Sequence, residues 1–298
     1  MEKDKFVLVL RGGANSGIFG CGIGTGIIKL GLYDHIEAVY SVSCGGFNGA
    51  YLAARQDSIG YLNYTEELTR NFINLRNIFS LLRRSIYQNK QGDTFGNVID
   101  INYAVKVVRE GPFRLDINAV SRCQFPIYLS VWNLDERRVE FIDLRTSVDP
   151  FQILKATSCI LPYFWSHVSV NGYKYIEPYL NDSFSFDRIT RVCKDKKIVV
   201  VFNDRFQHFD LLSYVLAALE GFVARRYSPR IRLLDPIRNK RKFNRDLKLC
   251  LESENVLVIK PPQDLVSPIC TDKLKLLQLY QWGIEAAGQI PEFLERRA

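Results

Sequence analysis

The stretch "EAVYSVSCGGFNGAYLAA", residues 37–54, decides how this chain folds near its start. An apolar run that ends at Val42 is typical of a buried strand, and the small residues after it favour a closely packed helix. Ser43 stands between the two. A serine on a sharp strand-to-helix turn forms a nucleophile elbow, written G-x-S-x-G, although Ser41 replaces the first glycine here.

A second strand-to-helix unit stands ahead of this stretch. Its strand is predicted over Phe6–Leu10, followed by a glycine-rich loop and a helix within Gly12–Gly31. Two such units joined by short connections are typical of a parallel sheet covered by helices. Further strands are predicted at 127–132, 198–202 and 256–259, with 139–142 pairing against the first of these as a hairpin.

The rest of the chain is predicted to be mainly helical. Helical periodicity fills two insertions, at about 57–122 and 205–250. A C-terminal helix is expected over Thr271–Arg297, with a second short helix beginning at Pro291. No internal repeat, low-complexity stretch or linker divides the 298 residues, so we expect a single domain over 1–298.

The composition is that of a globular protein, with 47% hydrophobic and 24% charged residues. No apolar run approaches the roughly 20 residues of a membrane span, and the start of the sequence lacks the features of a signal peptide. The seven cysteines show neither CxxC pairs nor zinc-site spacing. We therefore expect reduced thiols, no metal or other cofactor, and a cytoplasmic location.

The positive charge is concentrated in one segment. The net charge is +8, and between Arg225 and Lys248 ten basic residues are opposed only by Asp235 and Asp246, so this segment accounts for all of it. Such a segment, next to the apolar run 209–223, favours docking on anionic phospholipid headgroups, although a solvated surface could have the same composition. The residues that we assign to membrane docking are Arg225, Arg226, Arg230, Arg232, Lys240, Arg241 and Lys242.

The loop after the first strand reads "RGGANSG", residues 11–17. It contains neither an intact G-x-G-x-x-G nor a G-x-x-x-x-G-K-[ST], which argues against dinucleotide and P-loop phosphate binding. What remains is a run of small residues before a helix, whose backbone N–H groups can face an anion. An oxyanion that develops during acyl transfer is such an anion, so Gly12, Gly13 and Ala14 are the candidate donors.

A glycine loop after the first strand, followed about 30 residues later by a serine elbow, resembles the patatin-like phospholipase family. The family's third motif, D-G-[GA], corresponds to Glu177-Pro178-Tyr179 within "GYKYIEPYLNDSFSFD", residues 172–187. Further likeness lies in "ILKATSCILPYF", residues 153–164, and in a C-terminal segment similar to that of the bacterial cytoplasmic subgroup. The resemblance covers nearly the whole chain. It implies a three-layer α/β/α fold with a mainly parallel central sheet and helical insertions.

The resemblance also implies a chemistry, in which a serine–carboxylate dyad hydrolyses acyl esters of phospholipids or lysophospholipids at a membrane surface. Ser43 would attack the acyl carbonyl, Glu177 would accept its proton, and the Gly12–Ala14 loop would stabilise the oxyanion. The protein would then lie at the inner face of an anionic membrane. The chain departs from the family motifs at six positions. In the loop, Ala14 replaces a glycine and Ser16 a basic residue, and in the elbow Ser41 replaces a glycine. In the third motif, Glu177 replaces the aspartate, and Pro178 and Tyr179 replace the two glycines.

Three alternatives remain. The altered motifs are compatible with a patatin fold that has lost catalysis and binds lipid or a protein partner. The order Ser43, Glu177, His208 matches the triad of α/β-hydrolases, but in that fold the elbow follows several strands, so we interpret His35, His167 and His208 as ordinary histidines. Nucleic-acid binding is not expected, because few aromatic residues interleave the basic segment. The oligomeric state is left open.

Overall fold

A single sheet organises the residues that the computed structural model describes, which are 5–79, 96–203, 211–262 and 267–296. The sheet has eight strands in the order β5-β6-β3-β2-β1-β7-β8, and β4 pairs with β3 beside that path. Its strands are β1 (Phe6–Leu10), β2 (Ile36–Ser41), β3 (Ile127–Asn133), β4 (Arg138–Asp143), β5 (Val168–Val170), β6 (Tyr173–Ile176), β7 (Lys197–Val201) and β8 (Val256–Ile259).

The sheet is mainly parallel, as expected. β1 pairs in parallel with β2 and β7, and the parallel pairing continues to β3 on one side and β8 on the other. The hairpin of β3 and β4 is antiparallel, as are the pairs of β6 with β3 and with β5. The short β5–β6 hairpin was not predicted from the sequence, because each strand has only three or four residues and three of these seven are exposed.

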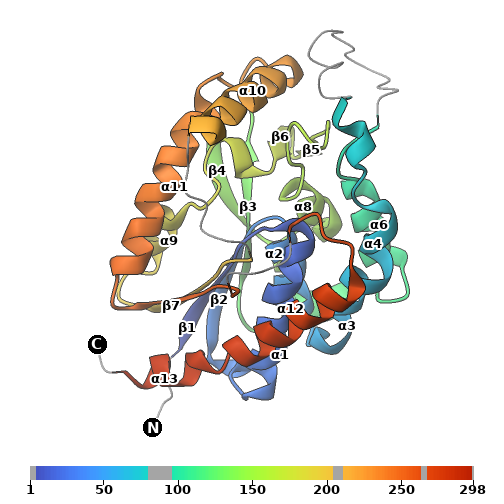
Figure 1. Ribbon diagram of the computed structural model, residues 1–298. Coiled ribbons are helices and arrows are strands. Elements are labelled where there is room, and N and C mark those ends of the chain that lie inside the picture. Colours follow the sequence, from blue (N-terminus) through green and yellow to red (C-terminus); the bar gives the residue numbers. More distant parts are fainter. Residues whose placement is uncertain (1–4, 80–95, 204–210, 263–266, 297–298) are drawn as a thin grey trace.

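Helices cover both faces of the sheet and confirm the three-layer architecture (Figure 1). Alternate residues of β1 enter two different cores: Leu8 packs toward α1 (Ile18–Lys29), while Val7 packs toward α9 (Phe186–Val192) and α11 (Asp235–Glu252). This alternation follows from the two-residue period of a strand. α2 (Cys44–Ala53) and α12 (Lys273–Ala286) lie on the same face as α1.

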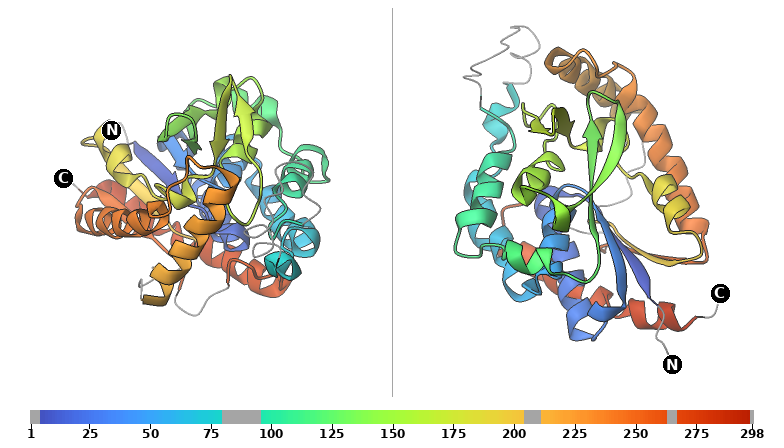
Figure 2. Two further views of the ribbon diagram at one scale, coloured as in Figure 1. Left: turned by 90° about the horizontal axis from the view of Figure 1, so that it is seen from above. Right: turned by 180° about the vertical axis from the view of Figure 1, so that it is seen from behind.

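The predicted insertions are helical where they are described. The first contains α3 (Asp57–Leu62), the π-helical turn η3 (Asn63–Glu67), α4 (Leu68–Asn71), the 3-10 turn η4 (Leu75–Asn77), α6 (Ile101–Glu110) and α7 (Ile117–Ser121). The second contains α10 (Leu211–Tyr227) and α11. α8 (Pro150–Ala156) follows β4. Seen from behind in Figure 2, α10 and α11 stand at one side of the molecule and α4 and α6 at the other.

The C-terminal part differs slightly from the prediction. α12 ends at Ala286, and the second helix, α13, begins at Gln289 and not at Pro291. A proline fits the first turn of a helix, where its missing N–H has no intrahelical partner, so Pro291 marks that turn and not the break itself. The break falls at Ala287 and Gly288.

Parallel strands bring their carboxyl ends to one edge of the sheet, where α/β proteins place their ligand sites. At this edge the loop after β1 begins with Arg11, the turn after β2 carries Ser43, and Asn203 follows β7. Glu177 comes directly after β6, which pairs antiparallel with the end of β3. These connections therefore converge on one region.

Candidate active site

Ser43 occupies a strained turn between β2 and α2. Its φ of 56° and ψ of −132° are rare for a residue with a side chain and are typical of functional turns under strain. The Ser43 N–H donates to the carbonyl oxygen and the hydroxyl of Thr157, at 3.0 and 3.1 Å. A Cβ added at Gly45 would lie 2.3 Å from the carbonyl oxygen of Leu10. Glycine at 45 therefore lets α2 start directly against β1, which gives the geometry of a nucleophile elbow.

The glycine loop is held in place by Asn203. The Asn203 Nδ2 donates to the carbonyl oxygens of Arg11 and Gly12, at 2.5 and 3.3 Å, while its Oδ1 accepts from the Gly20 N–H at 2.9 Å. A Cβ added at Gly13 would lie 2.7 Å from the Asn203 Cβ, so this approach requires glycine. Ala14 has a φ of 46°, which shows that alanine takes the left-handed conformation at this position.

The backbone of the glycine loop lies beside the serine. No acceptor is found within the described ranges for the N–H groups of Gly12, Gly13 and Ala14, whereas the flanking N–H groups of Arg11 and Asn15 donate to Val201 and Pro268. All three loop residues line the same cavity as Ser43, and a Cβ added at Gly12 would lie 3.0 Å from the Ser43 Cβ. Backbone N–H groups are almost always paired in proteins, so these three groups beside the serine are available to bind an anion.

Glu177 faces Ser43 from the end of β6. Its N–H is bound to the carbonyl oxygen of Cys159 at 3.1 Å, and its side chain is buried in the wall of the cavity. Burial raises the pKa of Glu177 to about 8, although a hydrogen-bonding interaction with the Ser43 hydroxyl and the positive charge of Arg11 oppose the rise. A carboxyl group with a pKa near neutrality, next to a serine hydroxyl, is suited to accept its proton.

Arg11 supplies the nearby positive charge. Its guanidinium carbon lies 4.6, 5.1 and 4.8 Å from the ring centres of Phe184, Phe202 and Phe243. Cation–π interactions of this kind help to hold a guanidinium in place. Arg11 thus keeps a fixed positive charge close enough to Glu177 to lower its pKa.

These groups line a cavity of about 500 Å³. On one side its wall is apolar and is built by Leu68 and Phe72 from the α4 segment and by Ile101, Ala104 and Val108 from α6. On the other side, polar groups come from the segment after α8, from the η6 turn (Pro178–Leu180) and the loop after it, and from α10 and α11. These polar residues are Tyr163, Tyr179, Ser183, Glu220, Asn239 and Lys240. We call the part of the cavity beside α4 and α6 the apolar chamber and the part beside α10 and α11 the polar chamber. Ser43 and Glu177 line the same cavity.

The seven basic residues assigned to membrane docking separate into three groups. Five of them are exposed on or near α10 and α11: Arg225, Arg226, Arg230, Arg232 and Arg241. Lys240 is half-buried and lines the cavity. The Lys242 ammonium lies 3.0, 2.5 and 2.6 Å from the carboxylates of Asp182, Asp187 and Asp246.

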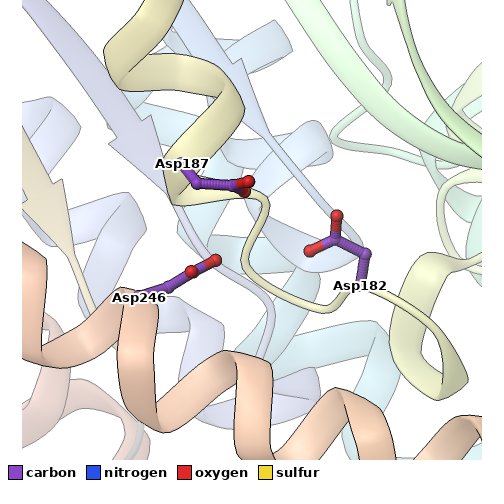
Figure 3. Close-up of side chains that lie close together, drawn as sticks. All are labelled: Asp182, Asp187 and Asp246. Atoms are coloured by element: carbon purple, nitrogen blue, oxygen red, sulfur yellow. The ribbon is translucent and has the colours of Figure 1, made fainter.

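Figure 3 shows how these three carboxylates point toward one another from the loop after η6, from α9 and from α11. Their oxygens lie within 4.8 Å of each other, a spacing that a metal ion could bridge. The Lys242 ammonium already bonds to all three, so the cluster works as an internal ion network that ties α11 to α9. Burial acts to lower the pKa of Lys242, but the three carboxylates outweigh it and raise the pKa.

The histidines that the structure describes lie away from the serine. His35 precedes β2 and so lies at the opposite end of that strand from Ser43. The His167 ring is hydrogen-bonded to the Tyr227 hydroxyl and does not line the cavity. His208 falls outside the described residues. All seven cysteines lie within the described ranges, none of them forms a disulfide, and all but Cys270 are buried.

Sequence reasoning missed four residues that shape the site: Arg11, Thr157, Asn203 and Glu220. The position of Arg11 in the sequence indicated a role, because a charged residue directly after a buried strand needs a partner. The position of Glu220 indicated a role as well, because it is the one acidic residue within the apolar run of α10. The positions of Thr157 and Asn203 gave no such indication, since each acts through contacts with residues more than a hundred positions away.

Comparison with known proteins places the chain in a family. A model described as "Patatin-like phospholipase" matches residues 8–187, which include Ser43, Glu177 and the glycine loop. No curated protein sequence matches the chain.

Two solved structures are similar at low identity. VipD from Legionella pneumophila is 12% identical with a TM-score of 0.45, and the match covers 97% of this chain and 67% of VipD. The type III effector protein ExoU is 11% identical with a TM-score of 0.45, and the match covers 99% of this chain. The chain spans only 55% of the ExoU chain.

Proposed function

This chain belongs to the patatin-like phospholipase family, and we propose that it is a lipid acyl hydrolase that uses Ser43 as nucleophile and Glu177 as base. The observation that carries this proposal is the placement of a serine on a strained elbow against a buried carboxyl group. A motif alone would leave open whether the longer glutamate reaches the serine. The burial of Glu177 in the wall of the cavity that Ser43 also lines supports this pairing, as does an interaction with the Ser43 hydroxyl that lowers the pKa of Glu177 against the larger effect of burial.

The proposed reaction has two steps. The Ser43 Oγ attacks the acyl carbonyl carbon while Glu177 takes the hydroxyl proton, and the N–H groups of Gly12–Ala14 stabilise the negative oxygen. Collapse of this intermediate releases the alcohol, which receives the proton back from Glu177, and leaves an acyl group on Ser43. A water molecule activated by Glu177 then releases the fatty acid by the same route.

The two chambers of the cavity suit a lipid ester. The apolar chamber between the α4 segment and α6 would take the fatty acyl chain, since burying each methylene gains about 0.8 kcal/mol. The polar chamber on the α11 side would take the alcohol that leaves. Leu75, Ile78 and Ile269 line the cavity and are 50, 47 and 45% exposed, so its rim presents apolar side chains to the surroundings.

We further propose that the protein docks on an anionic membrane through α10. Five large apolar side chains form one stripe along this helix and are 44–63% exposed: Leu212, Val215, Leu216, Leu219 and Phe222. The exposed Arg225 and Arg226 follow in its last turn, and Arg230 and Arg232 come shortly after. An apolar stripe with basic residues beside it is the composition of a helix that lies in a membrane interface. None of the described helices combines the length and apolar composition needed to cross a bilayer.

Release of fatty acid from lipid vesicles tests the hydrolase. The wild-type protein should release fatty acid, Ser43→Ala should be inactive, and Glu177→Gln should be slower by about 10³-fold or more, because it keeps the shape of the side chain but cannot accept a proton. Lys273→Gln, on the surface at α12, is a matched control that should retain full activity. Hydrolysis that persists in Ser43→Ala would contradict the assignment, and a folded wild-type protein that binds vesicles without hydrolysis would favour the binding-only alternative.

A further inference from the structure

The polar chamber of the cavity contains a second, half-buried carboxyl group that the proposed reaction does not use. Glu220 lies on α10, and its side chain lines the cavity. The Tyr163 hydroxyl donates to the Glu220 Oε1 at 2.6 Å, and the Tyr179 hydroxyl donates to the same oxygen at 3.1 Å. Two donated hydrogen bonds fix the carboxyl group and favour its ionised form.

The backbone of each tyrosine is hydrogen-bonded to a neighbouring segment that also lines the cavity. Tyr179 stands two residues after Glu177, and its carbonyl oxygen accepts a hydrogen bond from the Asn239 Nδ2 at 2.6 Å. The Tyr163 carbonyl oxygen accepts from the N–H groups of Val98 and Ile99, at 3.0 and 3.3 Å. The carboxyl group of Glu220 is therefore held by two tyrosines whose backbones are bound to α11 and to the segment before α6.

A positive group faces the same chamber. Lys240, one turn into α11, also lines the cavity. Burial raises the pKa of Glu220 above its ordinary value, and the hydrogen bonds from the two tyrosine hydroxyl groups and the positive charge of Lys240 oppose this rise. The chamber thus offers a carboxylate and an ammonium group within electrostatic reach of one another. A ligand that is complementary to both groups carries a positive and a negative charge close together.

We propose that this chamber binds the headgroup of a zwitterionic phospholipid or lysophospholipid, with Glu220 facing the headgroup ammonium and Lys240 facing its phosphate. This inference rests on the proposed function in one respect: it takes the polar chamber to be the place where the leaving alcohol binds. A primary ammonium donates hydrogen bonds to a carboxylate, and an aromatic side chain such as Tyr163 or Tyr179 beside it adds cation–π attraction. The headgroup of phosphatidylethanolamine carries this pair of charges.

Binding to protein that cannot turn over tests the proposal independently of catalysis. The probes are dihexanoyl phosphatidylethanolamine and dihexanoyl phosphatidylglycerol, used as monomers in calorimetric titrations of Ser43→Ala. The two probes share chains and phosphate and differ in the ammonium. The ethanolamine probe should bind at least about tenfold more tightly, as expected of a hydrogen-bonded charge pair.

Two variants separate the roles of the charged residues. Adding Glu220→Gln should weaken the ethanolamine probe by about tenfold and leave the glycerol probe nearly unchanged, because the amide keeps the acceptor but loses the charge. Adding Lys240→Met should weaken both probes alike, because both contain the phosphate. Glu292→Gln, in an exposed ion pair on α13, is the matched control and should change neither.

Several results would overturn the proposal: equal affinities for the two probes, a preference for the glycerol probe, no binding of either at millimolar concentration, or an equal loss for both in Glu220→Gln. The proposed hydrolase is judged separately, by labelling of Ser43 with a fluorophosphonate that has no headgroup. Labelling in wild type and in Glu220→Gln at the same rate, with no probe preference, would leave the hydrolase standing and remove the headgroup site. Tighter binding of the ethanolamine probe without labelling of Ser43 would support the headgroup site and contradict the hydrolase.

Discussion

Glu177 is the residue on which the proposed chemistry turns. Its carboxyl group is buried beside Ser43, and burial raises its pKa to about 8 from an ordinary value of 4.5. The group acts as a base only when it is ionised. At neutral pH most molecules would therefore hold Glu177 in its protonated, inactive form.

The rate should accordingly rise with pH. We expect the rate of serine acylation to increase as the pH rises through about 8 and to level off above it, because ionisation of Glu177 generates the base. The measurement is the second-order rate of fluorophosphonate labelling between pH 5 and pH 10. A rate that is already level at pH 6 would show that Glu177 ionises in its ordinary range or does not serve as the base.

The same shift affects stability. The folded protein holds the proton of Glu177 more tightly than the unfolded chain does, so the wild type loses stability as the pH rises from about 4.5 to about 8. Glu177→Gln has no such ionisation. Above pH 8 this variant should be more stable than the wild type, by a few kcal/mol on the scale of about 1.4 kcal/mol for each unit of pKa shift.

Urea unfolding of both proteins at pH 5 and at pH 9 measures this difference. The Glu292→Gln variant, which changes an exposed glutamate, controls for the loss of any carboxylate. The account would be contradicted if the difference in free energy of unfolding between Glu177→Gln and wild type were the same at both pH values.

Much of the site at residue scale could be predicted from local motifs. Ser43, Gly45 and the small residues of the loop follow from spacing, because a nucleophile elbow and an anion-binding loop are local structures. Arg11 and Asn203 could not be assigned roles, because their partners are brought together only by the sheet. Arg11 depends on the rings of Phe184, Phe202 and Phe243. Asn203 depends on the glycine loop. The roles of Ser43 and Glu177 stay predictions until they are tested.

At the scale of elements, the contact of α2 with β1 is the critical junction. A Cβ at position 45 would meet the carbonyl oxygens of Leu10 and Arg11 at 2.3 and 2.8 Å, and backbone atoms cannot move aside as a flexible side chain can. Gly45→Ala should therefore lower the free energy of unfolding by about 2–4 kcal/mol, in the range of strained core substitutions, and displace Ser43.

Gly24→Ala on α1 is the matched control. A Cβ there would meet only Leu52, at 3.8 Å, which is ordinary contact, and alanine favours a helix over glycine by about 1 kcal/mol. This variant should be as stable as the wild type or slightly more stable in urea unfolding. If Gly45→Ala were equally tolerated and labelled at the wild-type rate, the elbow would not depend on this close approach.

The main elements were also predictable, because long periodic segments carry strong signals. The strands at the centre of the sheet and the β3–β4 hairpin are confirmed. The β5–β6 hairpin was missed because its strands are short and half-exposed. The role of Lys242 in an ion network with three aspartates was missed because it joins two helices more than fifty residues apart, so we leave it out of the docking surface.

At the scale of the whole molecule, α10 and the apolar rim of the cavity suggest how the protein meets a membrane. Leu216 and Leu219 lie on the stripe of α10 and are 51 and 56% exposed, so serine at both positions should leave the fold intact. This double variant should bind anionic vesicles at least about tenfold more weakly than the wild type in a sedimentation assay, because it removes apolar contact with the interface.

Two controls accompany that experiment. Leu274→Ser, at an exposed position on α12, should bind vesicles normally. Binding should also weaken at high salt, because the exposed arginines of the α10 and α11 region act through long-range electrostatics. Equal binding by the double variant and the wild type would remove α10 from the docking surface. The single-domain organisation and the location at the inner face of a membrane stay predictions.

The central claim is that the elbow serine is an activated nucleophile. Intact-mass measurement after incubation with a fluorophosphonate tests it most directly, because this reagent traps activated serines whatever their natural substrate. The account predicts one adduct on the wild type, none on Ser43→Ala and a rate lower by about 10³-fold on Glu177→Gln. A folded wild-type protein that gains no adduct over hours at pH 9 would contradict it.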